Sequence, residues 1–225
     1  MKIIIPIGGG EIPSTTIEID KYIISLVRKD IIKVLFIPTA SGDNELYISK
    51  FKDYYKSLGC VVDTLLLSQT ENDMLIRTKI FGSDIIYIGG GNTGRAIRKF
   101  KRYHIDEYLK KAYERGIILT GLSAGAMVYF DSGYSDSNRS TNINNPLSYL
   151  KCLNLIPYCL CPHYNEPERK TFDNFVKDNN YKGIALEDNC ALVFIDDKIK
   201  GIIKANIDAK GYYIDDNKIE IESIS

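Results

Sequence analysis

The pattern Gly-Leu-Ser-Ala-Gly at 121–125 holds the first residues whose types and spacing could do chemistry. An apolar run at 116–120 precedes it, and the helix-compatible segment 126–130 follows. A strand, a tight turn and a helix in this order are typical of a nucleophile elbow, in which small flanking residues let the serine hydroxyl stand out of the turn. The helix N-terminus behind the turn adds amide donors and positive potential. The pattern predicts Ser123 as a nucleophile, with an inert serine in a tight turn as the alternative.

A serine nucleophile needs a general base, and the chain has only two histidines, His104 and His163. His104 starts a polar helical segment, where a surface position is the simplest interpretation. His163 follows the apolar stretch 155–162, so it is expected just past the carboxyl end of a buried strand, where open α/β sheets place ligands and catalysis. We therefore predict that His163 is the base, and a structural histidine is the alternative.

The acid that orients the imidazole has two candidates. Glu187 ends the predicted strand 183–186 and would lie at the same edge of the sheet as the histidine. Asp136 lies in the Ser-rich stretch after the nucleophile and would give the chain order Ser, Asp, His that α/β-hydrolases use. An ordinary turn or loop carboxylate is the alternative interpretation of each. We expect Glu187 to be the acid, because it ends a strand in a position to meet the imidazole, with Asp136 as the alternative.

A second glycine-rich segment, Gly-Gly-Gly-Asn-Thr-Gly at 89–94, follows the predicted strand 84–88. It spells G-x-G-x-x-G, but the dinucleotide interpretation needs an acid at the end of the next strand, and that strand ends in the serine motif instead. A glycine loop beside a nucleophile can supply an oxyanion donor. We expect Gly90 or Gly91 to donate together with the Ala124 amide. The Gly-Gly-Gly at 8–10 could border the same cleft, although a plain turn is its simpler role.

The elements that must position these residues alternate between short β-branched runs and longer stretches of helical period, which predicts βαβ units around a buried parallel sheet covered on both faces. Beyond residue 150 one helical stretch remains, followed by short strands that predict a C-terminal antiparallel meander at an edge of the sheet. The segment 131–145 is rich in Ser, Asn and Asp and is expected to be an exposed loop. The predicted strands are 2–7, 33–38, 60–66, 84–88, 116–120, 183–186, 191–195, 198–202, 211–214 and 218–221. The predicted helices are 16–28, 45–58, 73–81, 105–115 and 167–178.

Composition limits the class of protein. The chain has 225 residues, 44% of them hydrophobic, and equal numbers of acidic and basic side chains, so we expect one domain over residues 1–225 and no nucleic-acid partner. No apolar run is long enough to span a bilayer, and the N-terminal segment does not resemble a secretory leader. The five cysteines lack paired C-x-x-C spacing, which disfavours disulfides and a metal site. The sequence therefore predicts a cytoplasmic protein that binds no metal or other cofactor.

Three motifs together resemble the dipeptidase E (aspartyl dipeptidase) and cyanophycinase family of serine peptidases: Gly-Gly-Gly-Asn-Thr at 89–93, Gly-Leu-Ser-Ala-Gly-Ala at 121–126 and Pro-His-Tyr at 162–164. The resemblance covers nearly the whole chain. It implies an α/β fold with a mostly parallel, doubly wound sheet similar to class I glutamine amidotransferases. It also implies Ser123 as nucleophile, His163 as base, and either Glu187 or Asp136 as acid.

The same resemblance implies hydrolysis of small peptides near an acidic residue and assigns Asn92 and Arg169 to substrate binding. Arg169 would pair with a substrate carboxylate, as in an Asp-X dipeptide. Glu166 and Glu168 are close in sequence and could instead neutralise it. The alternatives to a peptidase are an esterase or amidase of small metabolites and a non-catalytic ligand-binding member of the fold. The sequence leaves open whether the protein forms a homodimer.

Overall fold

The computed structural model describes residues 1–70 and 72–224, and within this part of the chain the first sheet has seven strands. Its strands are β1 (Ile3–Ile7), β2 (Lys33–Ile37), β3 (Val61–Thr64), β4 (Ile85–Ile88), β5 (Ile118–Leu122), β10 (Cys190–Ile195) and β11 (Lys198–Lys204). The spatial order is β11-β10-β1-β5-β4-β2-β3, with β1 to β5 parallel and β10 and β11 antiparallel. The predicted α/β class is confirmed.

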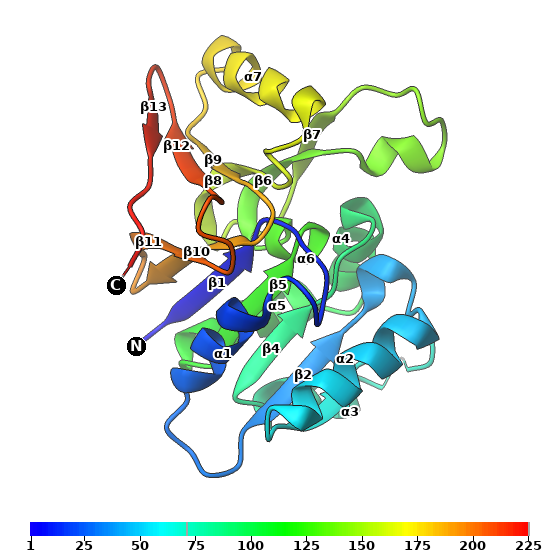
Figure 1. The fold of residues 1–225 in the computed structure, drawn as a ribbon. Coiled ribbons are helices and arrows are strands. Elements are labelled where there is room, and N and C mark those ends of the chain that lie inside the picture. Colours follow the sequence, from blue (N-terminus) through cyan, green and yellow to red (C-terminus); the bar gives the residue numbers. More distant parts are fainter. Residues whose placement is uncertain (71, 225) are drawn as a thin grey trace.

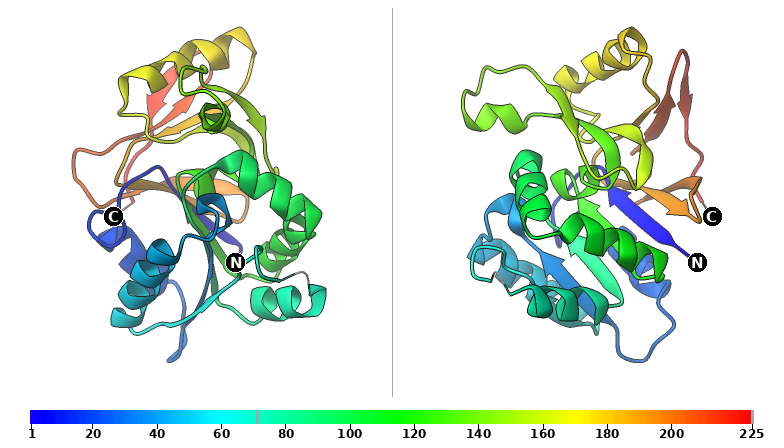
Figure 2. Two further views of the ribbon diagram at one scale, coloured as in Figure 1. Left: turned by 90° about the vertical axis from the view of Figure 1, so that its right-hand side faces the viewer. Right: turned by 180° about the vertical axis from the view of Figure 1, so that it is seen from behind.

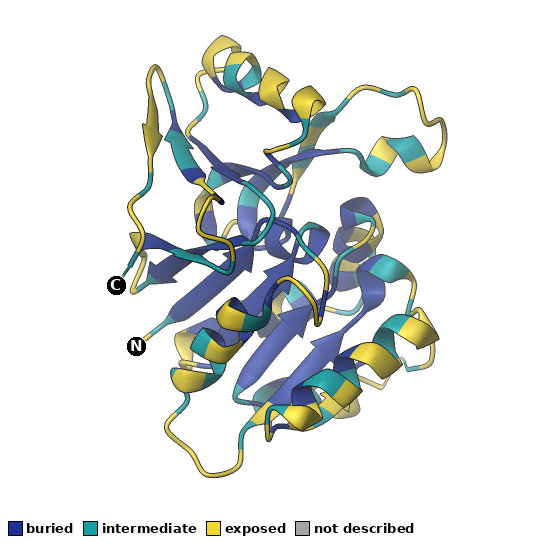
Figure 3. Ribbon diagram, viewed as in Figure 1, coloured by how far each residue is buried: buried dark blue, intermediate teal, exposed yellow. Residues whose placement is uncertain are grey.

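Helices cover both faces of this sheet (Figure 1). They are α1 (Ile17–Ser25), α2 (Glu45–Ser57), α3 (Asp73–Phe81), α4 (Thr93–Arg102) and α5 (Ile105–Glu114). Alternate residues of the central strands belong to two separate apolar clusters, one with α1 and α2 and the other with α3, α4 and α5. Because successive side chains of a strand point to opposite faces, this division shows a doubly wound sheet. Figure 3 shows its central strands buried and the outer helix surfaces exposed.

Asparagine caps explain where the crossover helices begin. Asn44, Asn72 and Asn92 each accept a hydrogen bond from the backbone N–H three residues later, at the start of α2, α3 and α4. Such a cap satisfies one of the free N–H groups of the first turn and stabilises a helix by about 1 kcal/mol. The helix α4 begins at Thr93, inside the glycine-rich segment 89–94, so its cap Asn92 also fixes the position of the glycines that precede it.

A second sheet was not predicted from the sequence. Within the described residues it has six strands: β6 (Phe130–Ser135), β7 (Ser148–Lys151), β8 (Ile156–Cys161), β9 (Gly183–Leu186), β12 (Gly211–Ile214) and β13 (Lys218–Glu220). Their order is β13-β12-β9-β8-β6-β7, and α7 (Phe172–Asp178) packs on it. In Figures 1 and 2 this sheet and α7 lie beyond the carboxyl ends of the parallel strands.

Two sequence predictions are corrected here. The C-terminal strands form, but they do not make one meander at the edge of the parallel sheet: β10 and β11 join β1, whereas β9, β12 and β13 join the second sheet. The predicted loop 131–145 begins with a buried strand, since β6 pairs with β7 on one side and β8 on the other. Its Asp, Ser and Gly content concealed this strand. No described helix is long and apolar enough to cross a membrane.

Candidate active site

The serine motif forms a sharp turn at the end of β5. Ser123 has φ 53° and ψ −109°, a conformation that costs a non-glycine residue about 1–3 kcal/mol. The backbone around it is held by hydrogen bonds from the Ser123 N–H to the Ile7 carbonyl (2.9 Å) and from the Met127 N–H to the Ser123 carbonyl (2.9 Å). A Cβ on Gly125 would lie 2.0 Å from the Ile88 carbonyl oxygen, so this position admits only glycine.

The helix that follows the serine is shorter than predicted. It is α6 (Ala124–Met127), a single turn, and the chain then enters β6 at Phe130. The predicted helical segment 126–130 is therefore corrected to one turn. Ala124 is the first residue of that turn, so its N–H has no intrahelical acceptor and faces the start of the helix beside Ser123.

Ser123 and His163 are brought together. The Ser123 Oγ lies 2.7 Å from the His163 Nε2, and the Nδ1 on the other side of the ring lies 2.6 Å from the Asp188 Oδ1. His163 follows β8 and has φ 53°, with its N–H donating to the Gly8 carbonyl (3.2 Å). Three side chains from β5, β8 and β9 thus form one hydrogen-bonded series.

The acid expected from the sequence is corrected by this geometry. Asp188, one residue after Glu187, is the carboxylate at the histidine. Glu187 instead accepts a hydrogen bond from the Lys210 N–H (3.0 Å), and Asp136 accepts one from the Arg169 guanidinium (3.1 Å). The reason is local: β9 ends at Leu186, and the turn after it, in which Asn189 has φ 63°, directs Asp188 toward His163.

Asn165 holds Asp188 in place. Its Nδ2 donates to the Asp188 Oδ2 (3.0 Å), and its Oδ1 accepts from the Asp188 N–H (2.8 Å). The hydrogen bond with His163, the bond from Asn165 and the nearby charge of Arg169 lower the pKa of Asp188. An ionised Asp188 is an acceptor only, so Nδ1 of His163 carries the proton and Nε2 of the neutral ring accepts the Ser123 O–H.

The Gly-Gly-Gly segment at 8–10 passes directly over this series. A Cβ on Gly9 would lie 1.8 Å from the Asp188 Oδ1 and 2.4 Å from the His163 Nδ1. Any side chain there would displace the histidine or the aspartate. The sequence pointed to this segment only as a turn that could border the cleft, so Gly9 is a site residue whose importance was missed.

The predicted oxyanion donors occupy different positions. A Cβ on Gly90 would lie 3.9 Å from the Ser123 Cβ, whereas one on Gly91 would lie 2.4 Å from the Ala40 carbonyl oxygen. Gly90 is therefore beside the serine, and Gly91 packs against η1 (Thr39–Ser41). The Gly90 N–H already donates to the Tyr47 hydroxyl at 3.2 Å.

Asn92 was expected to bind substrate, and its amide is bonded inside the protein. The Oδ1 accepts from the Arg95 N–H (2.8 Å) as the cap of α4, and the Nδ2 donates to the Ser137 carbonyl (3.0 Å). The Gly94 N–H also donates to the Ser137 Oγ (3.1 Å). These contacts make Asn92 the residue that ties the glycine loop to η2 (Ser137–Ser140).

Arg169, the other expected substrate contact, is only 3% exposed. Its Nε donates to Glu166 (3.3 Å), its Nη2 to Asp136 (3.1 Å), and its Nη1 to the Tyr134 carbonyl (3.1 Å). The neighbouring Glu168 is bonded to Arg139 instead. Of the two glutamates that could neutralise Arg169, Glu166 does so, with Asp136.

The remaining candidates have structural surroundings. His104 is an exposed residue at the start of α5, with its Nδ1 3.6 Å from Glu107. The five cysteines are buried and reduced, and burial raises the pKa of the Cys159 thiol to about 12. Among the residues that the structure describes, no group of three or more His, Cys, Asp or Glu side chains could hold a metal ion.

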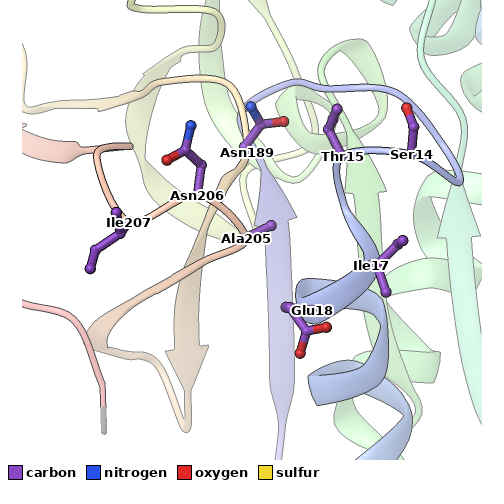
Figure 4. Close-up of a pocket in the computed structure, with 8 residues that line it drawn as sticks. All are labelled: Ser14, Thr15, Ile17, Glu18, Asn189, Ala205, Asn206 and Ile207. Atoms are coloured by element: carbon purple, nitrogen blue, oxygen red, sulfur yellow. The ribbon is translucent and has the colours of Figure 1, made fainter.

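Two cavities border the loop after β1. The first, of about 330 Å³, lies on the serine side, and Gly90, Leu122 and Tyr47 are among its lining residues. The second, of about 510 Å³, is shown in Figure 4, where Ser14 and Thr15 lie on one side, Asn206 and Ile207 on the other, and Asn189 between them. Neither Ser123 nor His163 is among the lining residues of either cavity, but the first reaches Leu122, which directly precedes the serine, and Gly90, which lies beside it.

A strained serine at the carboxyl end of a parallel strand, bonded to a histidine that is bonded to a carboxylate, defines a serine hydrolase of α/β fold. Comparison with known proteins gives the family. The model of peptidase family S51 matches residues 4–202, and the chain belongs to this family of serine peptidases.

Individual relatives agree with this assignment. The chain is 32% identical to the uncharacterized peptidase YgaJ of Bacillus subtilis over 219 residues, which is 95% of this chain and 92% of that protein. It is 29% identical to Peptidase E of Streptomyces coelicolor over 60% of this chain and 53% of the other. The expected resemblance to the dipeptidase E family is therefore confirmed.

Solved structures show the same fold. A putative peptidase E protein from Listeria monocytogenes matches with a TM-score of 0.71 and 24% identity, over 91% of this chain and 98% of that one. A peptidase from an acI-B1 actinobacterium matches with a TM-score of 0.76 and 17% identity, over 100% and 96%. At these identities the likeness supports the fold alone.

Proposed function

We propose that this family S51 peptidase hydrolyses short peptides through an acyl-enzyme on Ser123. The observation that carries the proposal is the series Ser123–His163–Asp188, with contacts of 2.7 Å and 2.6 Å. These are hydrogen-bond distances at which a neutral imidazole can take the serine proton while a carboxylate stabilises the imidazolium that forms.

The proposed reaction has two halves. The Ser123 Oγ attacks the peptide carbonyl, its proton passes to the His163 Nε2, and the carbonyl π pair moves to oxygen. When the tetrahedral intermediate collapses, the C–N bond breaks, the leaving amine takes the proton from His163, and an ester on Ser123 remains. Water then attacks that ester, with His163 again accepting and returning a proton, and the free carboxylate leaves.

Short substrates fit the surroundings of the serine. The loop after β4 lies beside Ser123 and the loop after β1 lies beside His163, and the adjoining cavity of about 330 Å³ is of a size for one or two residues. The family name implies a peptide substrate. We infer dipeptides and similarly short peptides rather than folded proteins.

A preference for an N-terminal Asp, which the resemblance suggests, receives no support from Arg169. Each of its three nitrogens is bonded to a protein oxygen, and Asp136 and Glu166 balance its charge. A substrate carboxylate would have to replace one of these partners and come close to both acids. We therefore propose that residue preference at the substrate N-terminus is set elsewhere and does not require Asp.

The test measures turnover of a panel of N-terminally free dipeptides and, in parallel, aryl esters. Wild type and Ser123→Ala are compared, and a fluorophosphonate probe with mass spectrometry identifies the labelled serine. Dipeptide hydrolysis by wild type, absent in the variant, together with label on Ser123 supports the proposal. Ester hydrolysis without any peptide hydrolysis would instead identify an esterase, and label on another serine would reject Ser123 as nucleophile.

A further inference from the structure

The side chain of Tyr47 reaches the glycine loop beside the nucleophile. Its hydroxyl oxygen accepts a hydrogen bond from the Gly90 N–H at 3.2 Å. Gly90 is the loop residue next to Ser123, and its amide was expected to hold the oxyanion directly. An amide that donates to a tyrosine cannot donate a strong second bond to a substrate oxygen, so the tyrosine hydroxyl, bonded to that amide, is the alternative donor at this end of the loop.

The hydroxyl hydrogen of Tyr47 is available. A phenol donates one hydrogen bond and also accepts, and here the accepting side is used by Gly90. Among the residues the structure describes, the Tyr47 hydroxyl donates to no acceptor. Tyr47 lines the cavity of about 330 Å³ together with Gly90 and Leu122, and Leu122 directly precedes the serine. The free O–H therefore belongs to the space a substrate would enter.

The ring of Tyr47 is held firmly enough to aim this hydroxyl. The Tyr47 backbone N–H donates to the Asn44 cap (2.9 Å), and the ring meets Phe36 edge-on with centroids 5.2 Å apart. A Cβ on Gly89 would lie 2.9 Å from the Tyr47 Cε1, so the ring lies directly over the glycine loop. A pre-oriented donor stabilises developing charge without reorganising during the reaction.

The protonation state of the Tyr47 hydroxyl also suits a hydrogen-bond donor. Burial raises the pKa of Tyr47 to about 12, and the hydrogen bond from Gly90 acts in the opposite direction. The phenol therefore keeps its proton at neutral pH. By accepting from an amide, the hydroxyl also becomes a stronger donor, because hydrogen bonds in series polarise one another.

We propose that the Tyr47 hydroxyl donates a hydrogen bond to the carbonyl oxygen of the bound substrate and to the oxyanion that replaces it, with the Ala124 N–H as the other donor. This rests on the proposed function. The proton stays on Tyr47 throughout, the serine proton goes to His163, and Gly90 acts through the tyrosine rather than on the substrate.

The test is Tyr47→Phe, which keeps the ring and its contact with Phe36 and removes only the hydroxyl. Loss of one oxyanion donor costs about 10²-fold or more in kcat. We expect kcat to fall by roughly that factor, with KM changed less than about threefold. Tyr54→Phe is the matched control, because Tyr54 lies on the same helix outside the cavity, and it should retain wild-type kcat.

A peptide aldehyde separates this role from a merely structural one, because its adduct with Ser123 carries an oxygen at the oxyanion position. The inhibition constant should weaken in Tyr47→Phe by the same factor as kcat/KM falls. A kcat within about threefold of wild type would overturn the proposal, because the freed Gly90 amide would then serve as donor itself. An unchanged aldehyde affinity would overturn it too.

Failure of the inference is distinguishable from failure of the proposed function. Fluorophosphonate labelling of Ser123 needs no peptide activity, and ester hydrolysis can replace dipeptide hydrolysis in the comparison. Labelling of Tyr47→Phe at the wild-type rate rejects the role of Tyr47 and leaves Ser123 as nucleophile. Absence of label on Ser123 in wild type rejects both.

Discussion

Two charged networks lie beyond the end of β8, and they have opposite properties. In the first, His163 contacts Ser123 on one side and Asp188 on the other, and the cation forms only when a proton arrives. In the second, Arg169 is permanently charged, 3% exposed and bonded through all of its nitrogens. A histidine can take up and release a proton while it keeps both contacts, whereas an arginine stays charged and holds together the segments that supply its three acceptors. We interpret the first network as reactive and the second as structural.

The largest effect is expected at the nucleophile. Ser123→Ala should lower kcat by about 10⁴-fold or more and leave the Tm close to wild type, because the small hydroxyl contributes little packing. Steady-state kinetics on dipeptides and a thermal melt measure both.

His163→Ala should be similarly inactive, since triad members act as a unit, and His104→Ala serves as the control with near-normal activity. An equal loss of kcat in the two histidine variants would contradict the assignment of His163 as the base.

The next effect distinguishes the adjacent carboxylates. Asp188→Asn should lower kcat by about 10²–10⁴-fold, because the amide favours the wrong histidine tautomer and cannot stabilise the imidazolium. Glu187→Gln keeps an oxygen for the Lys210 N–H and should stay within about threefold of wild type. Asp136→Asn extends the comparison to the other carboxylate considered from the sequence. The reverse order of kcat values would return the orienting role to Glu187 or Asp136.

The site residues that a local sequence pattern marks could be predicted, and those that depend on contacts between distant segments could not. The contact between Ser123 and His163 could be expected because a strand-turn-helix pattern and the scarcity of histidine mark the two residues. The carboxylate expected at the histidine was Glu187, whereas its neighbour Asp188 makes the contact, because one residue of register at the end of β9 decides which of the two meets the ring. The bonds between Asp188 and Asn165 span 23 residues and leave no local pattern.

The strands of the fold likewise differ in how far local composition predicts them. The strands β1, β2 and β4 of the first sheet are apolar runs buried on both faces, so their positions could be predicted closely from hydrophobicity. The second sheet includes β6, with the sequence Phe-Asp-Ser-Gly-Tyr-Ser, which is buried only because strands pair with it on both sides. Pairing between distant segments overrides local composition there, and the sequence alone did not show it.

Substrate preference tests the structural interpretation of Arg169. Wild type should cleave Asp-, Asn- and Leu-initiated dipeptides with kcat/KM values within about tenfold of one another, because Arg169 is buried and a substrate carboxylate would meet Asp136 and Glu166 beside it. Arg169→Met should lower the free energy of unfolding by about 2 kcal/mol, since two half-exposed acids and one carbonyl lose their partner. A strong preference for Asp that Arg169→Met abolishes would show that Arg169 binds substrate after all.

The smallest effect is expected at the pair Glu168–Arg139, which borders the same network but lies at the surface. The hydrogen bond from Arg139 lowers the pKa of Glu168 from its ordinary value of 4.5. A lowered carboxylate pKa means that the folded protein gains stability above pH 4.5 and loses that gain as the pH falls through the folded-state pKa.

Because Glu168 is 47% exposed, solvent screens most of the gain. Thermal melts of Glu168→Gln should therefore differ from wild type by no more than about 2 °C at pH 7, and the difference should shrink as the pH falls through the folded-state pKa of Glu168. If Glu168→Gln at pH 7 destabilised the protein as much as Arg169→Met does, the pair at the surface would share the structural role that we reserve for the buried arginine.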